Sequence, residues 1–469
     1  TVLVDTEKRK SVIAGHENAA ACGGLVLTMG GSAADQDLDA VSALIAADFL
    51  LAKAVGPHLG VDGEGAACFF ATLTGLDGAF GFLNGRINNP ASGGLAALAK
   101  TAGLEWPHVH CVAFDIAPDW QDTAAVAETV AAELLTPDPA RPAEIGLAEG
   151  VRYTLAAEAC EPDPGQLHLN AADVAVVTGG ARGVTAAAAV ALAEKTGCTT
   201  ILLGRSERLP TEPDWIETLT DEAAMKKAIL SNRFKGKASP REIEREFRSI
   251  VSGRAIDQTL QAIERAGGRA VYFPADVRDQ NQIHALMARI RAEYGPIRAI
   301  IHGAGVLEDR LITEKTGDQF RKVYDTKVCG LTSLLETVDP EALKYLVLFS
   351  SVSARTGNRG QADYAIANEV LNKLARAYAQ ANTTCKVAAI NWGPWDGGMV
   401  SPALKKEFQR AGIDLIPIAG GVERMLQEMA APADGPVETI IGATLQPAAA
   451  PAMTKAQPQD DLALLVKHQ

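Results

Sequence analysis

The sequence lacks several features that would place the protein outside an aqueous compartment. It has no uninterrupted apolar run long enough to cross a bilayer, and no signal-type pattern opens it. Its seven cysteines are scattered, without the paired spacing of a metal site, which favours reduced thiols in a cytoplasm. Positive charge is also in deficit, since the formal net charge is −13. An acidic chain of this kind argues against nucleic acid as a partner. We therefore expect a cytoplasmic protein that binds neither membranes nor nucleic acids, with no metal site.

The chain is rich in apolar segments. At 469 residues with 47% hydrophobic content, it is large enough to form two cores. Apolar strand patterns alternate with Ala- and Leu-rich helical patterns in both halves of the chain. This alternation predicts an α/β fold built from two layered units.

A hydroxyl and a phenol follow one apolar strand at a spacing that suits carbonyl reduction. Residues 345–349 predict a buried parallel strand, which places Ser351 at its carboxyl end. Tyr364 lies thirteen residues later and returns on a helix to the same edge, where ligands bind in open α/β sheets. Reducing a ketone builds negative charge on its oxygen, so we predict that Ser351 orients the carbonyl and Tyr364 donates the proton.

Two further residues support the phenol. A free phenol has a pKa of about 10, so a neighbouring cation is needed to stabilise the phenolate. Lys327, on a helix predicted to run beside that of Tyr364, is the candidate cation, and Asn368 lies one helical turn after Tyr364, where it can hold Lys327 or a relay water. Taken singly, a serine after a strand is often only a helix cap, and a surface lysine is usually solvated. The combination favours the functional interpretation.

A second constellation is typical of dinucleotide binding. An apolar strand at residues 173–177 leads into a glycine turn and then an Ala-rich helix. Such a turn lets the backbone approach a pyrophosphate, which the helix N-terminus stabilises. A lone glycine pattern can also be a mere turn. The turn consists of Thr178, Gly179, Gly180, Ala181, Arg182, Gly183 and Val184.

The end of the next strand indicates which dinucleotide is bound. Residues 199–203 are followed by Gly204, Arg205 and Ser206, where an NAD site would carry an acidic residue. A guanidinium forks onto a phosphate, so Arg205 favours the 2′-phosphate of NADP, although an arginine that is simply solvated is the alternative. Two later strand ends are predicted to face the adenosine and the nicotinamide. They carry Asp276 and Val277, and His302, Gly303, Ala304 and Gly305.

Together these residues resemble the ketoreductase domains of polyketide synthases and polyunsaturated fatty acid synthases, within the short-chain dehydrogenase/reductase superfamily. The motifs that carry the resemblance are TGGARGV at Thr178, LLGRS at Leu202, DV at Asp276, HGAG at His302, Lys327, FSS at Phe349, GQADYAIAN at Gly360 and INWGPW at Ile390. Free-standing members usually carry lysine four residues after the tyrosine. Here Asn368 holds that place and Lys327 lies upstream, as in multienzyme ketoreductases.

The resemblance implies a catalytic set of Lys327, Ser351, Tyr364 and Asn368. It implies NADPH as hydride donor and, as substrate, a β-ketoacyl group on an acyl carrier protein, which must contact a local basic patch on this acidic chain. The segment with Pro394, Trp395 and Met399 is expected to close over the nicotinamide and the acyl thioester. Thr185 stands where the family usually has another glycine, a change expected to shift the helix start slightly while keeping the phosphate contacts.

The stereochemical expectation also comes from the resemblance. Leu307-Glu308-Asp309 resembles the Leu-Asp-Asp loop of ketoreductases that form the (3R)-hydroxyl, and Asp309 is its surviving marker. Thr356, where the opposite class tends to carry tryptophan, agrees with this assignment. We assign Leu307, Asp309, Gln361, Trp395 and Met399 to substrate binding and stereochemistry.

The resemblance implies two Rossmann-like subdomains. Residues 1–170 are expected to form a truncated structural subdomain without cofactor, and residues 171–446 the complete NADPH-binding catalytic subdomain. The latter carries an insertion at about 207–256, in which Ser239 and Thr220-Asp221-Glu222 predict helix starts. The insertion either contacts a neighbouring domain or shields the cofactor edge. Residues 447–469, rich in Ala, Pro and Gln, are expected to be a linker to a following domain.

Two rival functions remain open from the sequence. The first is a catalytically idle or epimerising ketoreductase, against which the intact set of four residues argues. The second is a free-standing reductase of small ketones, which the bracing subdomain and the terminal linker disfavour.

Overall fold

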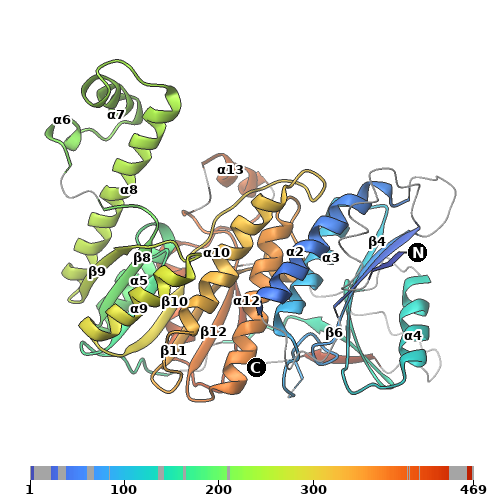
Figure 1. Cartoon of the computed structure of the whole chain (residues 1–469). Helices are drawn as coiled ribbons and strands as arrows, with labels where there is room; N and C mark the ends of the chain where they lie inside the picture. Colours follow the sequence, from blue (N-terminus) through green and yellow to red (C-terminus); the bar gives the residue numbers. More distant parts are fainter. Residues whose placement is uncertain are drawn as a thin grey trace.

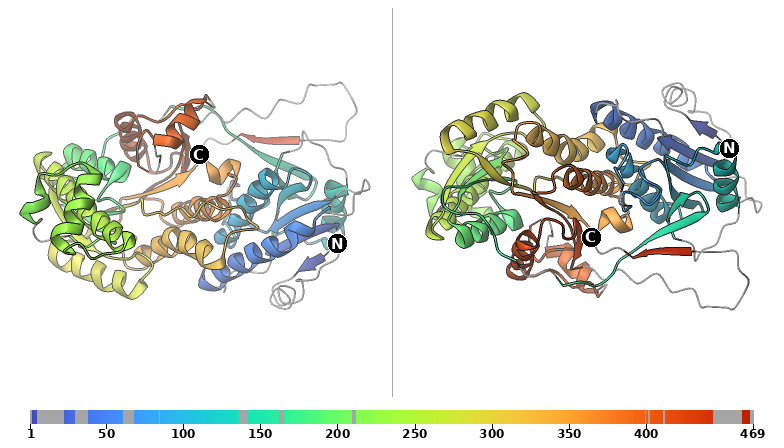
Figure 2. Two further views of the ribbon diagram at one scale, coloured as in Figure 1. Left: turned by 90° about the horizontal axis from the view of Figure 1, so that it is seen from above. Right: turned by 90° about the horizontal axis from the view of Figure 1, so that it is seen from below.

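The computed structural model describes residues 2–4, 23–29, 38–60, 68–83, 85–135, 142–161, 165–208, 212–398, 400, 402–410, 412–442 and 462–466. Within these residues the chain forms two α/β subdomains, each built on its own sheet, which lie side by side (Figures 1 and 2). The predicted α/β fold with two Rossmann-like units is confirmed. Nowhere in the described part of the chain is a helix both long and apolar enough to span a bilayer.

The C-terminal subdomain contains a sheet of seven parallel strands in the order β13-β12-β11-β10-β7-β8-β9. The strands are β7 (Val174–Thr178), β8 (Thr199–Gly204), β9 (Arg269–Pro274), β10 (Ile297–His302), β11 (Tyr345–Ser351), β12 (Lys386–Trp392) and β13 (Glu438–Ile441). Strand order reverses between β7 and β10, which pair directly. A ligand site is expected at the carboxyl ends of these two strands, because their connections diverge there.

Helices cover both faces of this sheet because its central strands are apolar on both sides. Ala175 and Val177 of β7 share a core with α5 (Gly183–Thr196), α8 (Pro240–Arg265) and α14 (Ile418–Ala430). Val174 and Val176 point the other way, into a core with α9 (Gln280–Tyr294), α10 (Gly317–Leu335) and α12 (Ala362–Ala381). Thr316 and Gln319 form a capping box that starts α10, the helix of Lys327.

The N-terminal subdomain has a second seven-stranded sheet among the described residues, in the order β1-β2-β3-β4-β5-β6-β14. Its strands are β1 (Val2–Val4), β2 (Gly24–Met29), β3 (Phe69–Thr74), β4 (His110–Ile116), β5 (Glu144–Ala148), β6 (Val151–Ala156) and β14 (Leu462–Val466). Only the β5–β6 pair is antiparallel. Strands β2, β3 and β4 alternate with helices along the chain, as the sequence pattern predicted for this half.

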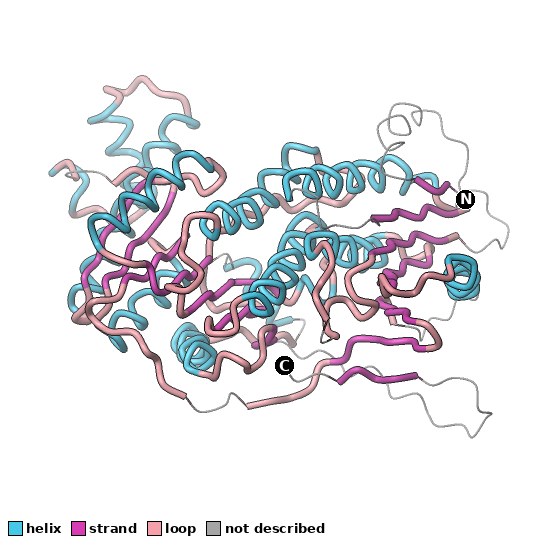
Figure 3. The backbone as a smooth tube through the Cα atoms, turned by 60° about the horizontal axis from the view of Figure 1, so that its bottom comes forward, coloured by secondary structure: helices cyan, strands magenta, loops and turns pink. Residues whose placement is uncertain are grey.

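The C-terminal segment differs in part from the expected linker. Residues 447–461 lie outside the described residues, but 462–466 form β14, which pairs in parallel with β6 (Figure 3). Its sequence LALLV is continuously apolar, so it suits a strand better than a solvated linker. The far end of the chain therefore extends the N-terminal sheet.

The two subdomains share one helical core. Helices α2 (Leu38–Val55) and α3 (Gly94–Glu105) of the N-terminal subdomain pack against α10 and α12. Phe49 stacks on Phe320 with ring centroids 4.6 Å apart. A Cβ on Gly94 would lie 2.7 Å from Cγ2 of Val370, so the absence of a side chain lets α3 approach α12 closely. The N-terminal subdomain therefore supports the helix that carries Tyr364.

The insertion is helical, as predicted. It contains α6 (Asp214–Glu217), α7 (Glu222–Ala228), a π-helical turn (Ile229–Arg233) and the first part of α8. Asp221 caps α7, and Ser239 forms a capping box with Glu242 at the start of α8. The tip packs around its own small core and projects away from the body (Figure 1). Because α8 continues into the body, the insertion extends a helix of the minimal fold.

Candidate active site

Three elements bring the four predicted catalytic residues to one edge of the C-terminal sheet. Ser351 is the last residue of β11, Tyr364 lies in the first turn of α12, and Asn368 follows one turn later. Lys327 comes from the middle of α10, the helix that packs beside α12. The four residues therefore lie together, while the catalytic roles assigned to them stay predictions.

Lys327 is buried with its ammonium group directed at this edge. Its Nζ donates to the carbonyl oxygen of Phe349 at 2.9 Å and lies 5.2 Å from the centroid of the Tyr364 ring. Burial lowers the pKa of Lys327 to about 7, because the charged form loses solvation. A lysine with this pKa is easily shifted between its charged and neutral forms near neutral pH.

Tyr364 is held as a neutral phenol. Burial raises the pKa of Tyr364 above its ordinary value, and the side chains of Asn368 and Ser351 act in the opposite direction. Ser351 Oγ also accepts a hydrogen bond from the backbone N–H of Ser353 at 3.2 Å. Ser351 thus caps the turn after β11 and also borders the phenol, and its catalytic role stays a prediction.

Asn368 leaves one polar atom free within the site. Its Nδ2 donates to the carbonyl oxygen of Tyr364 at 2.8 Å, which fixes the amide against its own helix. Its Oδ1 is buried and has no hydrogen-bond partner among the described residues. Buried polar atoms are nearly always paired, so this oxygen marks a place for a water or a ligand group.

His302 is the last residue of β10, at a strand end that was predicted to face the cofactor. Its side chain is fully buried, and its contact with the cofactor stays a prediction. Its Nδ1 lies 2.9 Å from Oγ1 of Thr178, and its Nε2 lies 2.9 Å from the carbonyl oxygen of Lys327. Burial lowers the pKa of His302 to about 3, so the ring stays neutral. His302 therefore ties the helix of Lys327 to the glycine turn.

The glycine turn has the geometry of a phosphate site. Gly179 has φ 70°, and a Cβ there would lie 2.9 Å from the carbonyl oxygen of Gly303. Gly183, with φ 64°, begins α5, and Arg182 before it makes no side-chain cap. The first N–H groups of α5 are therefore left for an anion. Gly398 also approaches this turn, since its Cα lies 3.5 Å from where a Cβ of Gly183 would be.

Thr185 is accommodated by a glycine across the turn. A Cβ on Gly303 would lie 2.6 Å from Cγ2 and 2.7 Å from Oγ1 of Thr185, closer than real side chains approach. Thr185 is itself buried in the first turn of α5. The space for the threonine is thus provided by the missing side chain at position 303.

The strand ends predicted to select the nucleotide are arranged around exposed arginines. Arg182 and Arg205 are both exposed. The turn that carries Arg205 is fixed by Tyr272, whose OH donates to the carbonyl oxygens of Gly204 at 2.9 Å and Ser206 at 2.5 Å. The carboxylate of Asp276 is paired with Arg278, which lowers the pKa of Asp276. A dinucleotide carries phosphates, which the guanidinium groups of Arg182 and Arg205 can bind. It also carries ribose hydroxyls, which can donate hydrogen bonds to a carboxylate such as that of Asp276.

The predicted substrate residues divide into two groups. Gln361 Nε2 donates to both carboxylate oxygens of Asp309 at 3.1 Å, so the predicted stereochemical marker is bound to the turn before Tyr364. Trp395 is instead buried, with its ring centroid 4.6 Å from that of Trp392, and packs in the core. Leu307 and Pro394 are half-buried, and Met399 lies outside the described residues.

Three charged residues at this site were missed by the sequence analysis. Glu105 accepts hydrogen bonds from the backbone N–H groups of Ile312 and Gly360, and Lys315 forms a buried ion pair with Asp363 at 2.8 Å. For Asp363, the one local signal in the sequence is its position directly before Tyr364. Glu105 lies on α3 of the other subdomain, so no local pattern connects it with the site.

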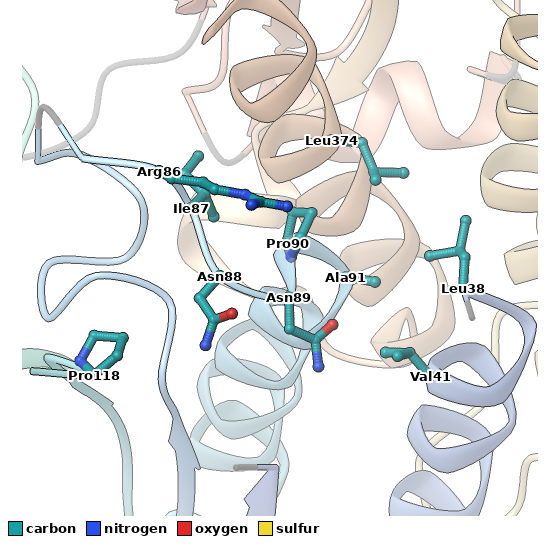
Figure 4. A pocket seen from close by; sticks show the side chains of 10 residues that line it. All are labelled: Leu38, Val41, Arg86, Ile87, Asn88, Asn89, Pro90, Ala91, Pro118 and Leu374. Atoms are coloured by element: carbon teal, nitrogen blue, oxygen red, sulfur yellow. The ribbon is translucent and has the colours of Figure 1, made fainter. Parts of the chain in front are cut away.

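One other possible site holds none of the predicted residues. A cavity of about 420 Å³ at the subdomain boundary is lined by residues of α2, the segment 86–91, Pro118 and Leu374 (Figure 4). In the residues that the structure describes, no three His, Cys, Asp or Glu side chains are grouped to hold a metal ion. The edge at β7, β10 and β11 is therefore the candidate active site.

Parts of this chain are similar to known proteins. The model of the KR domain family matches residues 174–397. One component of the polyunsaturated fatty acid synthase of Thraustochytrium sp. is 36% identical over 413 residues, which cover 84% of this chain and 14% of that protein. Polyketide synthase PksN of Bacillus subtilis is 35% identical over 161 residues, or 32% of this chain and 3% of that protein. This chain thus spans only a small part of these relatives.

Solved structures show the same fold. An A1-type ketoreductase superposes with a TM-score of 0.68 and 22% sequence identity, covering 97% of this chain and 86% of that chain. The match extends over both subdomains, since so much of this chain is covered.

Proposed function

Because residues 174–397 match the model of the KR domain family, we propose that the chain is a ketoreductase. We propose that it reduces a β-ketoacyl thioester on an acyl carrier protein with NADPH and forms the (3R)-hydroxyl. The observation that carries the proposal is the approach of the Lys327 ammonium to within 5.2 Å of the Tyr364 ring centroid at the carboxyl end of β11. We further propose that the chain acts beside neighbouring domains of a cytoplasmic multienzyme synthase. The free thiols of the six described cysteines suit a reducing compartment.

The proposed chemistry assigns one task to each residue. Arg205, the glycine turn and the N–H groups of α5 would hold NADPH, which would supply the hydride to the carbonyl carbon. Tyr364 gives its proton to the carbonyl oxygen as negative charge builds there, and Ser351 donates a second hydrogen bond that orients this oxygen. Lys327 stabilises the phenolate that remains, because a nearby cation favours the charged form of a phenol. A water on Asn368 Oδ1 would then relay a proton from solvent to Tyr364, which restores the phenol.

The (3R) assignment is supported by the contacts of Asp309. Its carboxylate is bound by Gln361, which lies three residues before Tyr364, so the loop with the marker borders the proton donor. Thr356 is exposed on α11 (Ser353–Thr356) nearby, and its hydroxyl donates to the carbonyl oxygen of Val352 at 3.1 Å. A β-keto group that enters beside this loop presents one face to the nicotinamide, and the loop sets which face it is.

The projecting insertion is the region we propose for partner contact. Its exposed side chains include Lys227, Lys235, Lys237, Arg241 and Arg245, on a chain with a formal charge of −13. Arg241 also lies in the first turn of α8, where a positive charge opposes the helix dipole, so helix stability does not account for it. A projecting basic tip suits an acidic neighbouring domain better than it suits shielding of the cofactor.

A direct assay tests the reductase proposal. NADPH consumption is measured with a panel of β-ketoacyl thioesters, each offered as a free soluble thioester and on an acyl carrier protein, and the alcohols are resolved by chiral chromatography. We expect turnover on both forms, a lower KM for the carrier-bound form, and the (3R)-alcohol. An idle scaffold would bind NADPH without consuming it, and a small-ketone reductase would prefer simple ketones to every thioester.

Charge reversal at the tip tests the partner contact separately. We expect Lys235→Glu with Lys237→Glu to raise KM for the carrier-bound substrate while leaving KM for the free thioester unchanged. Lys195→Glu, on α5 of the body, is a control for charge reversal outside the tip. If KM rises equally for the carrier-bound and the free thioester, the tip does not bind the carrier protein.

A further inference from the structure

Glu105 connects the N-terminal subdomain to both segments that border the proton donor. We propose that Glu105 is a positioning residue of the reductase: it holds the loop 307–312 against the turn before Tyr364, and so fixes the face from which the keto group is reduced. This inference rests on the proposed function, because it concerns the orientation of that substrate. It gives the N-terminal subdomain a part in selectivity in addition to support of the fold.

The contacts of Glu105 are direct and two-sided. Glu105 is the last residue of α3, and its Oε2 accepts the backbone N–H of Ile312 at 2.7 Å. Its Oε1 accepts the backbone N–H of Gly360 at 2.9 Å. One carboxylate therefore joins two loops of the other subdomain that lie about fifty residues apart in sequence. Burial raises the pKa of Glu105, and the two backbone hydrogen bonds oppose that rise.

The two loops are also bonded to each other at the same place. The backbone N–H of Arg310 donates to the carbonyl oxygen of Gly360 at 2.9 Å, and the Gln361 side chain binds Asp309. The hydrogen bonds of Glu105 thus flank the contact between the predicted stereochemical marker and the turn before Tyr364. A shift of either loop would change the position of Asp309 relative to the phenol.

A buried ion pair supports the other side of the same contact. Lys315 Nζ lies 2.8 Å from Asp363 Oδ2, with side chains that are 0% and 1% exposed, and it also donates to the carbonyl oxygen of Glu308. Asp363 Oδ1 accepts the backbone N–H of Tyr364 at 2.9 Å. Lys53 of α2 donates to the carbonyl oxygen of Lys315 at 2.7 Å, a second tie from the N-terminal subdomain. Loop and helix start are therefore fixed from both sides.

The chemistry of the carboxylate explains why the position is sensitive. A carboxylate offers two acceptor oxygens, whereas a glutamine of the same length offers one acceptor and an N–H₂ donor. In Glu105→Gln, one of the two backbone N–H groups would face that donor and lose its partner. The two hydrogen bonds of Glu105 go to Ile312 and Gly360, and neither goes to a residue of the proposed catalytic set. We therefore expect Lys327, Ser351 and Tyr364 to keep their arrangement while the loop is loosened.

Selectivity is the first readout. Glu105→Gln is compared with wild type and with Glu133→Gln, which breaks an ion pair with Arg152 inside the N-terminal subdomain. For Glu105→Gln we expect KM for a free β-ketoacyl thioester to rise and the ratio of (3R) to (3S) alcohol to fall, each by about tenfold, with KM for NADPH unchanged. Glu133→Gln should leave both values at wild type. An unchanged alcohol ratio in a folded Glu105→Gln protein overturns the proposal.

A second readout does not depend on turnover. In the protein without substrate, Glu105→Gln should speed hydrogen exchange at the amides of Ile312 and Gly360 by about tenfold or more, because their acceptor is weakened. Glu133→Gln should leave these amides unchanged. If wild type proves inactive on every β-ketoacyl thioester, the proposed function fails while faster exchange still establishes the positioning contact. Unchanged exchange refutes that contact whatever the enzyme does, and Glu105→Asp serves if the glutamine variant does not fold.

Discussion

The Nζ of Lys327 lies 5.2 Å from the centroid of the Tyr364 ring, although the two residues belong to different helices. Lys327 is held there by its bond to the Phe349 carbonyl oxygen, and its backbone carbonyl is held by His302. The cation therefore approaches the phenol from α10, while Asn368 occupies the next turn of α12. This arrangement places the predicted proton donor, the predicted cation and an acceptor without a partner among the described residues around one sheet edge.

The first prediction concerns the proton donor. Tyr364→Phe removes only the hydroxyl, so we expect turnover of a β-ketoacyl thioester to fall by about 10²–10⁴-fold or more, the usual contribution of a general acid. The dissociation constant of NADPH, measured by fluorescence titration, should stay near the wild-type value, because the change leaves the glycine turn and Arg205 intact. A variant that keeps the wild-type rate would remove Tyr364 as the acid.

The second prediction concerns pH. Burial lowers the pKa of Lys327 to about 7, so the cation dominates below that pH and the neutral amine above it. Because the cation is the form that stabilises a phenolate, the reduction rate should be flat below its midpoint and fall up to tenfold per pH unit above it. Bound phosphates favour the cation, which places the midpoint at pH 7 or above. A rate–pH profile over pH 6–10 measures it.

Lys327→Arg is the matched control for this profile. A guanidinium keeps its charge throughout this range, so the variant, whatever its rate, should show no fall in rate between pH 7 and 9. A wild-type rate that rises across the same range would mean that neutral Lys327 is the active form, and the assigned role would be wrong.

Local patterns were sufficient to predict the fold of the C-terminal subdomain. The strand before the glycine turn, the cap at Ser239 and the helix of Tyr364 each depend on neighbours a few residues apart, and all three are present. The sequence also predicted the convergence of Ser351 and Tyr364, because carboxyl ends of parallel strands share an edge. The roles of these residues stay predictions.

Long-range contacts could not be predicted in the same way. Glu105 bonds Gly360 at a separation of 255 residues, and β14 joins β6 from the far end of the chain. No periodicity encodes such partners. A histidine at a strand end suits a cofactor site or a buried network equally well, and only the contacts of His302 with Thr178 and Lys327 show that its side chain is part of a buried network. The contact of His302 with the cofactor stays a prediction. The prediction that the N-terminal subdomain binds no cofactor stays a prediction.

The third prediction concerns the choice of nucleotide. Arg205 is exposed at the end of β8, where a 2′-phosphate would lie. We expect Arg205→Ala to raise KM for NADPH by about 10–100-fold and KM for NADH by less than about threefold, because a hydrogen bond between charged groups contributes about 1.5–3 kcal/mol. Steady-state kinetics with both nucleotides measure this difference.

Arg208→Ala is the control for Arg205. Arg208 is exposed three residues later and already pairs with Asp257 at 2.7 Å, so its loss changes the net charge equally without removing a free guanidinium. It should leave both KM values near wild type. If Arg205→Ala weakens NADPH and NADH alike, the 2′-phosphate contact does not exist and the selectivity must come from elsewhere.

The fourth prediction concerns the packing of the Thr185 side chain against Gly303. A Cβ at position 303 would lie 2.6 Å from Cγ2 of Thr185, so Gly303→Ala should destabilise the fold by about 1–3 kcal/mol, the usual cost of overpacking. Thr185→Ala removes both close atoms, so the double variant should regain most of that loss. Urea denaturation of the four proteins gives the coupling free energy. If the effects of the two substitutions on the free energy of unfolding are simply additive, the space for Thr185 does not depend on the missing side chain at position 303.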